Sequence, residues 1–210
     1  MEFDVPKAKH WMMILNSKIQ DHKHDLTDLD LAIGDGDHGL NMARGFQEVM
    51  NKIENKEYPD LSTLFKEIGM TIISKVGGAS GPLYGTAFIK ASSIFQDKES
   101  ITISELAQAF NASLEGLKLR GRAQIGDKTM IDVWEPVVTF MMEQGDSLRP
   151  NDLAQLAEKT KEATKNLEAK KGRAAYLGKR SIGHIDPGAA SSCYLFEALA
   201  NVLEGEDFDE

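Results

Sequence analysis

Three aspartates within a short stretch are the residues most able to do chemistry in this sequence. The stretch Leu29 to Asn41 reads L-D-L-A-I-G-D-G-D-H-G-L-N and contains Asp30, Asp35 and Asp37; Gly34 precedes Asp35, and Gly36 separates Asp35 from Asp37. Carboxylates this close repel each other unless a cation lies between them. Magnesium is usually held by a few carboxylates together with substrate phosphates. The stretch therefore predicts a metal site that faces a phosphorylated ligand.

A helix is expected to begin directly after these aspartates. Beyond His38, apolar residues recur at helical spacing, at Met42, Phe46, Val49, Met50 and Ile53. The free N–H groups and positive dipole end of such a helix would favour a metal-bound phosphate. A simpler alternative is that Asp37 is only an N-cap and the other aspartates lie in a solvated loop. An EF-hand does not fit, because position twelve counted from Asp35 is Phe46 rather than a glutamate.

A glycine-rich run, Gly77 to Gly81 (G-G-A-S-G), is the second informative stretch. Its small residues let a ligand approach the backbone closely, and Pro82 suits the first turn of a following helix. A glycine-rich loop leading into a helix is a phosphate-binding arrangement. The alternative is a tight turn between two helices. A P-loop is excluded, because G-x-x-x-x-G-K-[ST] is absent and we expect no strand before the run.

Periodicity and capping signals predict an all-α domain of eight helices without strands. The expected helices cover about 6–23, 38–55, 60–76, 82–95, 102–120, 129–143, 151–171 and 188–204. Asp60 and Asn151 are expected N-caps, and Thr102 with Glu105 forms a capping box. Pro136 is expected to kink or restart its helix. The acidic tail, residues 204–210, should be frayed.

The segment from Gly172 to Pro187 is too long for a plain connector. Loops of this length inside a compact domain are usually functional or disordered. The segment carries basic or histidine side chains at Arg173, Lys179, Arg180 and His184. Its apolar residues, Tyr176 among them, favour an ordered and therefore functional segment.

The overall composition restricts the class of protein. The chain has 210 residues and no linker-like shift in composition, so we expect one domain over 1–210. Its 33 acidic and 24 basic residues give a net charge of -9, which disfavours nucleic acid or an anionic membrane as partner. The single cysteine, Cys193, indicates a buried thiol in a reducing compartment. Without a signal-like amino terminus or a membrane-length apolar run, a cytoplasmic location is expected.

Four motifs occur together and in order: G-D-G-D-H-G-L-N-M at 34–42, G-G-A-S-G-P-L-Y-G at 77–85, G-D-K-T-M at 126–130 and K-G-R-A-A-Y-L-G-K-R-S-I-G-H-I-D-P-G at 171–188. With these motifs the chain closely resembles the L subunits of bacterial dihydroxyacetone kinases over essentially its whole length. The resemblance implies an antiparallel, up-and-down barrel of eight amphipathic helices that holds a nucleotide at one end.

The resemblance also implies a ligand set. Two magnesium ions would bridge the nucleotide phosphates and would be held by Asp30, Asp35 and Asp37. Phosphate-side contacts would come from His38, Leu40, Asn41, Gly78, Ala79 and Ser80. Ribose and adenine contacts would come from Gly121, Thr129, Met130, Arg173, Asp186, Pro187 and Gly188. No residue is implied as a covalent catalyst.

A free-standing chain resembles the members that are fed by the phosphotransferase system. In these, ADP stays bound as a cofactor, is phosphorylated in place by a phosphohistidine carrier (the M subunit), and passes the phosphoryl group to dihydroxyacetone on the K subunit. The implied enzyme is a phosphoenolpyruvate-dependent phosphotransferase that is active only with its partner subunits. A homodimer and a transcriptional regulator are further expected partners. The related fatty-acid kinases tend to have threonine where His38 stands, so the histidine favours the dihydroxyacetone branch.

Two other functions are compatible with the motifs. A D-x-D magnesium phosphatase would use Asp35 as nucleophile and Asp37 as acid, and it needs a buried strand before the first aspartate. A nucleotide-loaded binding module could act only as a sensor or as a partner of a regulator. Reconstituted phosphoryl transfer separates the binding module from a kinase subunit.

Overall fold

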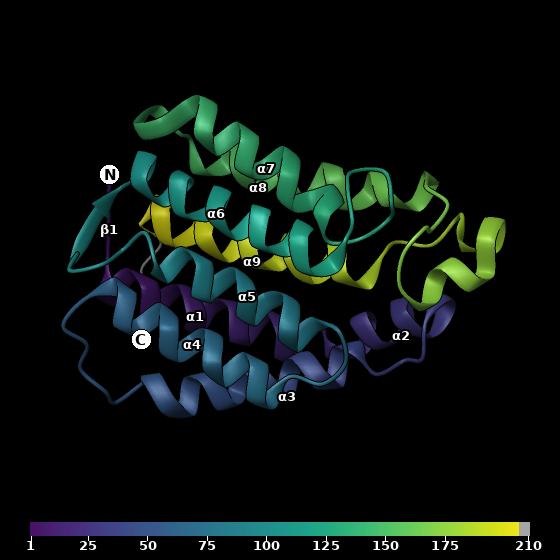
Figure 1. The fold of residues 1–210 in the computed structure, drawn as a ribbon, viewed down its shortest axis with the longest axis horizontal. Helices are drawn as coiled ribbons and strands as arrows, with labels where there is room; N and C mark the ends of the chain where they lie inside the picture. The colour runs from purple at the N-terminus through teal and green to yellow at the C-terminus, as the bar shows by residue number, and fades with distance from the viewer. Residues whose placement is uncertain (206–210) are drawn as a thin grey trace.

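The structure is a computed structural model that describes residues 1–205 (Figure 1). From residue 206 on, the acidic tail that was expected to be frayed lies outside the described residues. Within the described part, nine α-helices are present. They are α1 (Val5–Asp21), α2 (Lys23–Ile33), α3 (His38–Ile53), α4 (Leu61–Lys75), α5 (Ser80–Ser92), α6 (Ile103–Gly121), α7 (Ile131–Gln144), α8 (Pro150–Ala163) and α9 (Pro187–Glu204). Shorter elements are the strands β1 (Glu2–Asp4) and β2 (Ser100–Thr102) and the 3₁₀ helices η1 (Gly145–Ser147), η2 (Thr164–Asn166) and η3 (Arg173–Ser181).

Eight of these helices form a closed barrel. Each of α3 to α8 packs on the next helix of the chain, and α1 packs on both α3 and α9, which closes the ring. Aromatic side chains fill the interior: the Trp11 ring lies 5.6 Å from Phe88 and 5.8 Å from Phe110, centroid to centroid. Such pairs add to the gain from burying large apolar surfaces. The all-α barrel predicted from the sequence is confirmed.

Helix α2 was not predicted, and its residues were expected to form a loop. It lies outside the ring at one end, next to η3 and to the starts of α3 and α9 (Figure 1). Only Leu26, Asp30 and Ile33 of this helix are buried. Because so few positions are buried, the sequence of α2 has almost no apolar stripe at helical spacing, and the helix could not be predicted from periodicity. Asp30 is therefore on a helix rather than in a loop.

Several expected boundaries were wrong. A two-stranded antiparallel ladder pairs Phe3 with Ile101 at the end of the barrel opposite α2, where no strand was expected (Figure 1). Asn151 is not the N-cap of α8: the helix begins at Pro150 with Arg149 as its N-cap, because proline fits the first position of a helix. Helix α8 also ends at Ala163 and does not continue to Lys171. Helix α5 already begins at Ser80, and α7 continues through Pro136.

Other local predictions are confirmed. The Asp60 side chain accepts a hydrogen bond from the Thr63 backbone N–H at 2.6 Å, and Thr102 with Glu105 forms the complete capping box. The segment after Gly172 is ordered, as its apolar content indicated, and most of it is η3. None of the helices in residues 1–205 has the length and apolar character needed to cross a membrane.

Candidate functional site

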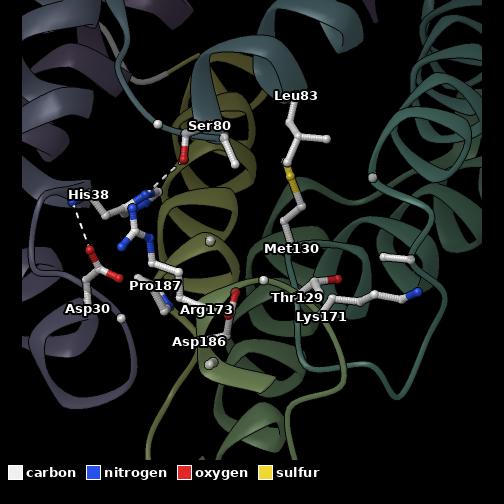
Figure 2. A pocket seen from close by; sticks show the side chains of 18 of the residues that line it. Asp30, His38, Ser80, Leu83, Thr129, Met130, Lys171, Arg173, Asp186 and Pro187 are labelled. Carbon is white, nitrogen blue, oxygen red and sulfur yellow. Dashed lines mark hydrogen bonds between the residues drawn. The ribbon is translucent and has the colours of Figure 1, made fainter. Parts of the chain in front are cut away.

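A cavity of about 490 Å³ opens at the α2 end of the barrel. Its wall combines the starts of α3, α5 and α9, the end of α6, the loop before α7 and the segment around Arg173 (Figure 2). This volume is in the range of small-molecule and cofactor pockets. Three helix N-termini converge on one cavity, and helix N-termini favour anions. No side chain caps the start of α5, whereas Asp30 accepts two N–H groups at the start of α3 and Asp186 accepts the Ala189 N–H at the start of α9.

The three aspartates meet at one edge of this cavity. Ligand oxygens of Asp30, Asp35 and Asp37 all lie within 4.8 Å of one another. Asp30 is buried, whereas Asp35 and Asp37 are exposed. A set of carboxylate oxygens at this spacing, open to a cavity, fits a hard divalent cation such as magnesium.

Asp30 also has a structural role. Its Oδ2 accepts hydrogen bonds from the backbone N–H groups of Asp37, at 2.9 Å, and His38, at 3.1 Å. Asp30 thus caps α3 from a neighbouring helix. Asp37 occupies the N-cap position of α3, but its side chain makes no capping bond. The interpretation of Asp37 as a simple N-cap is therefore wrong, and its carboxylate is available to a ligand.

The close approach of α2 and α3 depends on Gly39. A Cβ atom at this position would lie 1.9 Å from the Lys23 carbonyl oxygen, so any side chain would push the two helices apart. At the start of α5, Gly78 has a φ of +66°, which favours glycine. These two glycines place the α3 and α5 starts beside the aspartates.

Arg173 brings positive charge to the acidic edge. One guanidinium nitrogen lies 3.0 Å from an Asp35 carboxylate oxygen. Figure 2 shows the Arg173 side chain reaching from the long segment toward the side of the cavity that holds Asp30 and His38. The segment expected to be functional therefore contributes a cation to the cavity.

The His38 ring is buried between two serines. Its Nδ1 lies 3.0 Å from Ser80 Oγ, and its Nε2 lies 3.0 Å from Ser191 Oγ. Burial lowers the pKa of His38 to about 4, although Asp30 and Asp37 act in the opposite direction. The ring is therefore neutral near pH 7 and is held at both nitrogens.

The opposite wall of the cavity is less polar. Leu83 and Met130 point toward each other across this part of the site in Figure 2. The loop before α7 is held by Asp132, whose carboxylate accepts hydrogen bonds from the backbone N–H groups of Gly126, at 2.6 Å, and Thr129, at 2.8 Å. Burial raises the pKa of Asp132. The wall combines an apolar surface with a firmly held backbone.

Lys128 fixes the long segment against this loop. Its ammonium group is buried and donates hydrogen bonds to the backbone carbonyls of Thr164, at 2.7 Å, Leu167, at 3.2 Å, and His184. Burial lowers the pKa of Lys128. Its backbone φ is +61°, an unusual conformation for lysine. A buried ammonium without a carboxylate in hydrogen-bond contact thus joins the long segment, at His184, to the stretch that directly follows α8.

Asp186 caps the last helix beside the cavity. Its Oδ2 accepts a hydrogen bond from the Ala189 backbone N–H at 2.8 Å. Burial raises the pKa of this carboxyl group to about 7, although the capping bond works in the opposite direction. The Asp186 carboxyl group therefore titrates close to neutral pH.

Most of the residues singled out from the sequence line this one cavity. They are Asp30, Asp35, Asp37, His38, Gly78, Ala79, Ser80, Gly121, Thr129, Met130, Arg173, Asp186, Pro187 and Gly188. Leu40 and Asn41 are outside this set: the Leu40 side chain is exposed, and Asn41 Oδ1 accepts a hydrogen bond from Arg44. Sequence reasoning missed Lys128 and Ser191. Lys128 stands within the G-D-K-T-M motif, which was a usable signal, whereas Ser191 resembles any small residue of a buried helix.

Comparisons with known proteins all point to the same family. The model of the DAK2 domain matches residues 32–201. The ADP-binding subunit DhaL of PEP-dependent dihydroxyacetone kinase 1 from Listeria innocua is 50% identical over 95% of this chain and 97% of its own. The corresponding subunit of the PTS-dependent dihydroxyacetone kinase of Lactococcus lactis is 48% identical over 92% of this chain and 95% of its own.

A solved structure shares the fold. The dihydroxyacetone kinase from C. freundii, in complex with AMP-PNP and Mg²⁺, superposes with a TM-score of 0.72 at 27% identity. The match covers 92% of this chain but only 33% of that longer chain. The barrel described here is therefore similar to one part of that chain.

Proposed function

Because the chain belongs to the DAK2 domain family, we propose that it is the ADP-binding subunit of a dihydroxyacetone kinase that obtains its phosphoryl group from phosphoenolpyruvate. Two relatives that the chain matches over nearly their whole length carry such names. The observation that carries the proposal is the meeting of three carboxylates with three helix N-termini around one cavity. That arrangement suits a metal-bound polyphosphate.

Asp30, Asp35 and Asp37 would hold the magnesium, which we propose to be two ions. When bound, magnesium would neutralise the repulsion between the carboxylates and the phosphate oxygens. A divalent cation at Asp35 competes with the Arg173 guanidinium, because both are attracted to the same carboxylate. Arg173 is then free to pair with a phosphate oxygen, for which its planar fork of donors is well suited.

The remaining contacts are assigned by their place in the cavity. Backbone N–H groups at the starts of α3 and α5 face the phosphates. The apolar wall with Leu83 and Met130 receives the adenine ring, and Gly121 and Thr129 lie beside it. The C. freundii kinase, whose structure contains AMP-PNP and Mg²⁺, supports a nucleotide with magnesium as the ligand.

The chain is proposed to hold and orient the nucleotide while other chains supply the reacting partners. Phosphoryl transfer needs chiefly positioning and charge neutralisation, which the cavity offers. Both ring nitrogens of His38 are hydrogen-bonded, so this residue is a poor candidate for carrying a phosphoryl group. Dihydroxyacetone would therefore be presented by a K subunit, and the phosphoryl group would come from a phosphohistidine on an M subunit, with ADP remaining bound.

The phosphatase alternative fails on the fold, because Asp35 follows helix α2 and not a buried strand. A role as nucleotide sensor, contact with a transcriptional regulator, and a homodimer stay proposals. Steady-state phosphorylation of dihydroxyacetone, with each component omitted in turn, tests the proposed function. Turnover should require this chain, a K subunit and a phosphohistidine donor together. Rapid turnover by this chain with ATP alone would refute the subunit assignment.

A further inference from the structure

A chain of hydroxyl groups runs from the cavity into the barrel core, and the proposed phosphoryl transfer does not use it. It begins at Ser80, crosses the His38 ring and reaches Ser191, with 3.0 Å at each step. It continues from Ser191 to Tyr84 at 2.7 Å and ends through Ser192 at Trp134. The chain ties α3, α5, α7 and α9 together, and the members between Ser80 and Trp134 are buried.

The proton positions at the core end follow from donor chemistry. The Trp134 indole N–H can only donate, so Ser192 Oγ accepts its hydrogen bond, at 3.1 Å. Ser192 can then pass its own proton to Tyr84 Oη at 2.9 Å. The Tyr84 proton then goes to Ser191 Oγ, at 2.7 Å, which lies closer than its other acceptor, the Gly188 carbonyl at 3.5 Å. One lone pair of Ser191 is thereby used.

The proton positions at the cavity end follow from one carbonyl group. The Gly188 carbonyl can only accept, so Ser191 donates its proton to it, at 3.2 Å. The remaining lone pair of Ser191 accepts from His38 Nε2. Nδ1 then has no proton and accepts from Ser80 Oγ. In the opposite tautomer the proton is on Nδ1 and Nε2 can only accept. Ser191 would then have to donate its single proton to Nε2, and its hydrogen bond to the Gly188 carbonyl would be lost.

We propose that Ser191 and Ser80 fix His38 as the Nε2–H tautomer, so that His38 is a positioning residue that bridges the starts of α3, α5 and α9. With its proton directed to His38, the Ser80 hydroxyl does not donate to a phosphate oxygen. The phosphate at this corner is bound by backbone N–H groups at the start of α5 instead. Only this last consequence rests on the proposed function; the tautomer does not.

Nitrogen NMR of the ligand-free chain, with ¹⁵N-labelled imidazole rings, tests the tautomer. The His38 signals are identified by their loss in His38→Gln. The wild type should show a protonated Nε2 and an unprotonated Nδ1. Ser80→Ala should shift the Nδ1 resonance, because its donor is lost, while Nε2 keeps its proton. Ser191→Ala should shift the Nε2 resonance instead.

Ser113→Ala is the matched control, since Ser113 is also buried but donates to the Ala87 carbonyl far from the ring. It should leave both His38 resonances in place. A proton on Nδ1, alone or together with Nε2, would overturn the proposal. So would a Ser80→Ala spectrum in which Nδ1 does not move.

Calorimetric titration with ADP and Mg²⁺ tests the consequence for the phosphate. A lost hydrogen bond to a charged phosphate would weaken binding about tenfold or more. We expect Ser80→Ala to weaken it by less than that factor, and a larger loss would contradict the assignment of Ser80. If the wild type did not bind ADP while its NMR spectrum showed the Nε2–H tautomer, the proposed function would fail and the tautomer would stand.

Discussion

The Asp30 carboxylate accepts a hydrogen bond from the His38 backbone N–H at 3.1 Å, across the junction between α2 and α3. The same oxygen also accepts from Asp37, so one buried carboxylate holds two N–H groups at the start of α3. Asp30 therefore combines a structural role with its role as a proposed metal ligand. Asp35 and Asp37 lack this structural role.

This difference predicts unequal effects of alanine substitution on stability. Asp30→Ala leaves two N–H groups without their acceptor and should lower the free energy of unfolding by about 1–3 kcal/mol. Asp35→Ala and Asp37→Ala should change it by no more than about 0.5 kcal/mol, as is usual for exposed positions. Urea denaturation in the absence of magnesium measures all three. Equal losses in the three variants would show that Asp30 does not cap α3.

The sequence was sufficient to single out the three aspartates but not to show how Asp30 is placed. The close spacing of the aspartates and the helix after them predict a metal and phosphate site, and the structure brings their carboxylates together. Helix α2 buries only three residues, so periodicity offers no signal for it. The contacts of Lys128 with Thr164 and His184 are likewise invisible, because they join backbone carbonyls far along the chain.

The depressed pKa of His38 predicts a dependence of stability on pH. The pKa is 6.5 in the unfolded reference and about 4 in the fold, because burial disfavours the charged ring. Between these values the unfolded chain binds more protons. The contribution of His38 is therefore complete above pH 6.5 and is lost as the pH falls to about 4, by roughly 3 kcal/mol.

His38→Gln removes this titration. Relative to the wild type, the variant should gain free energy of unfolding as the pH falls from 6.5 to 4, in metal-free buffer. Denaturation curves at several pH values give the difference. A constant difference across this range would mean that the folded protein tolerates a charged His38.

Asp186 should act in the opposite direction. Its pKa rises from 3.8 in the unfolded reference to about 7 in the fold, mainly through burial. The folded chain then binds more protons, so the contribution is complete below pH 3.8 and is lost as the pH rises through 7, by roughly 4 kcal/mol. Asp186→Asn keeps an oxygen acceptor for the Ala189 N–H but cannot ionise. Its free energy of unfolding should rise relative to the wild type between pH 4 and 7, and parallel curves would disprove the shift.

Lys128 is predicted to control the order of the segment between α8 and α9. Lys128→Met keeps the length of the side chain but leaves three backbone carbonyls without their donor. Amide hydrogen exchange in residues 164–184 should accelerate, with a loss of stability of about 1–3 kcal/mol. Lys170→Met, at an exposed position of the same segment, is the control and should leave exchange unchanged. Similar exchange in both variants would rule out the clamp.

Native mass spectrometry of the purified chain tests whether ADP and magnesium are bound together in the cavity. Carboxylates cannot bind an anionic phosphate tail without a cation between them, so the nucleotide and the metal should travel together. Retention through purification implies a dissociation constant near nanomolar, about -12 kcal/mol. We predict a mass increase equal to one ADP and two magnesium ions, which disappears after treatment with a chelator and is absent in Asp35→Ala. A chain that never carries ADP, or ADP that stays bound after complete removal of magnesium, would contradict the account.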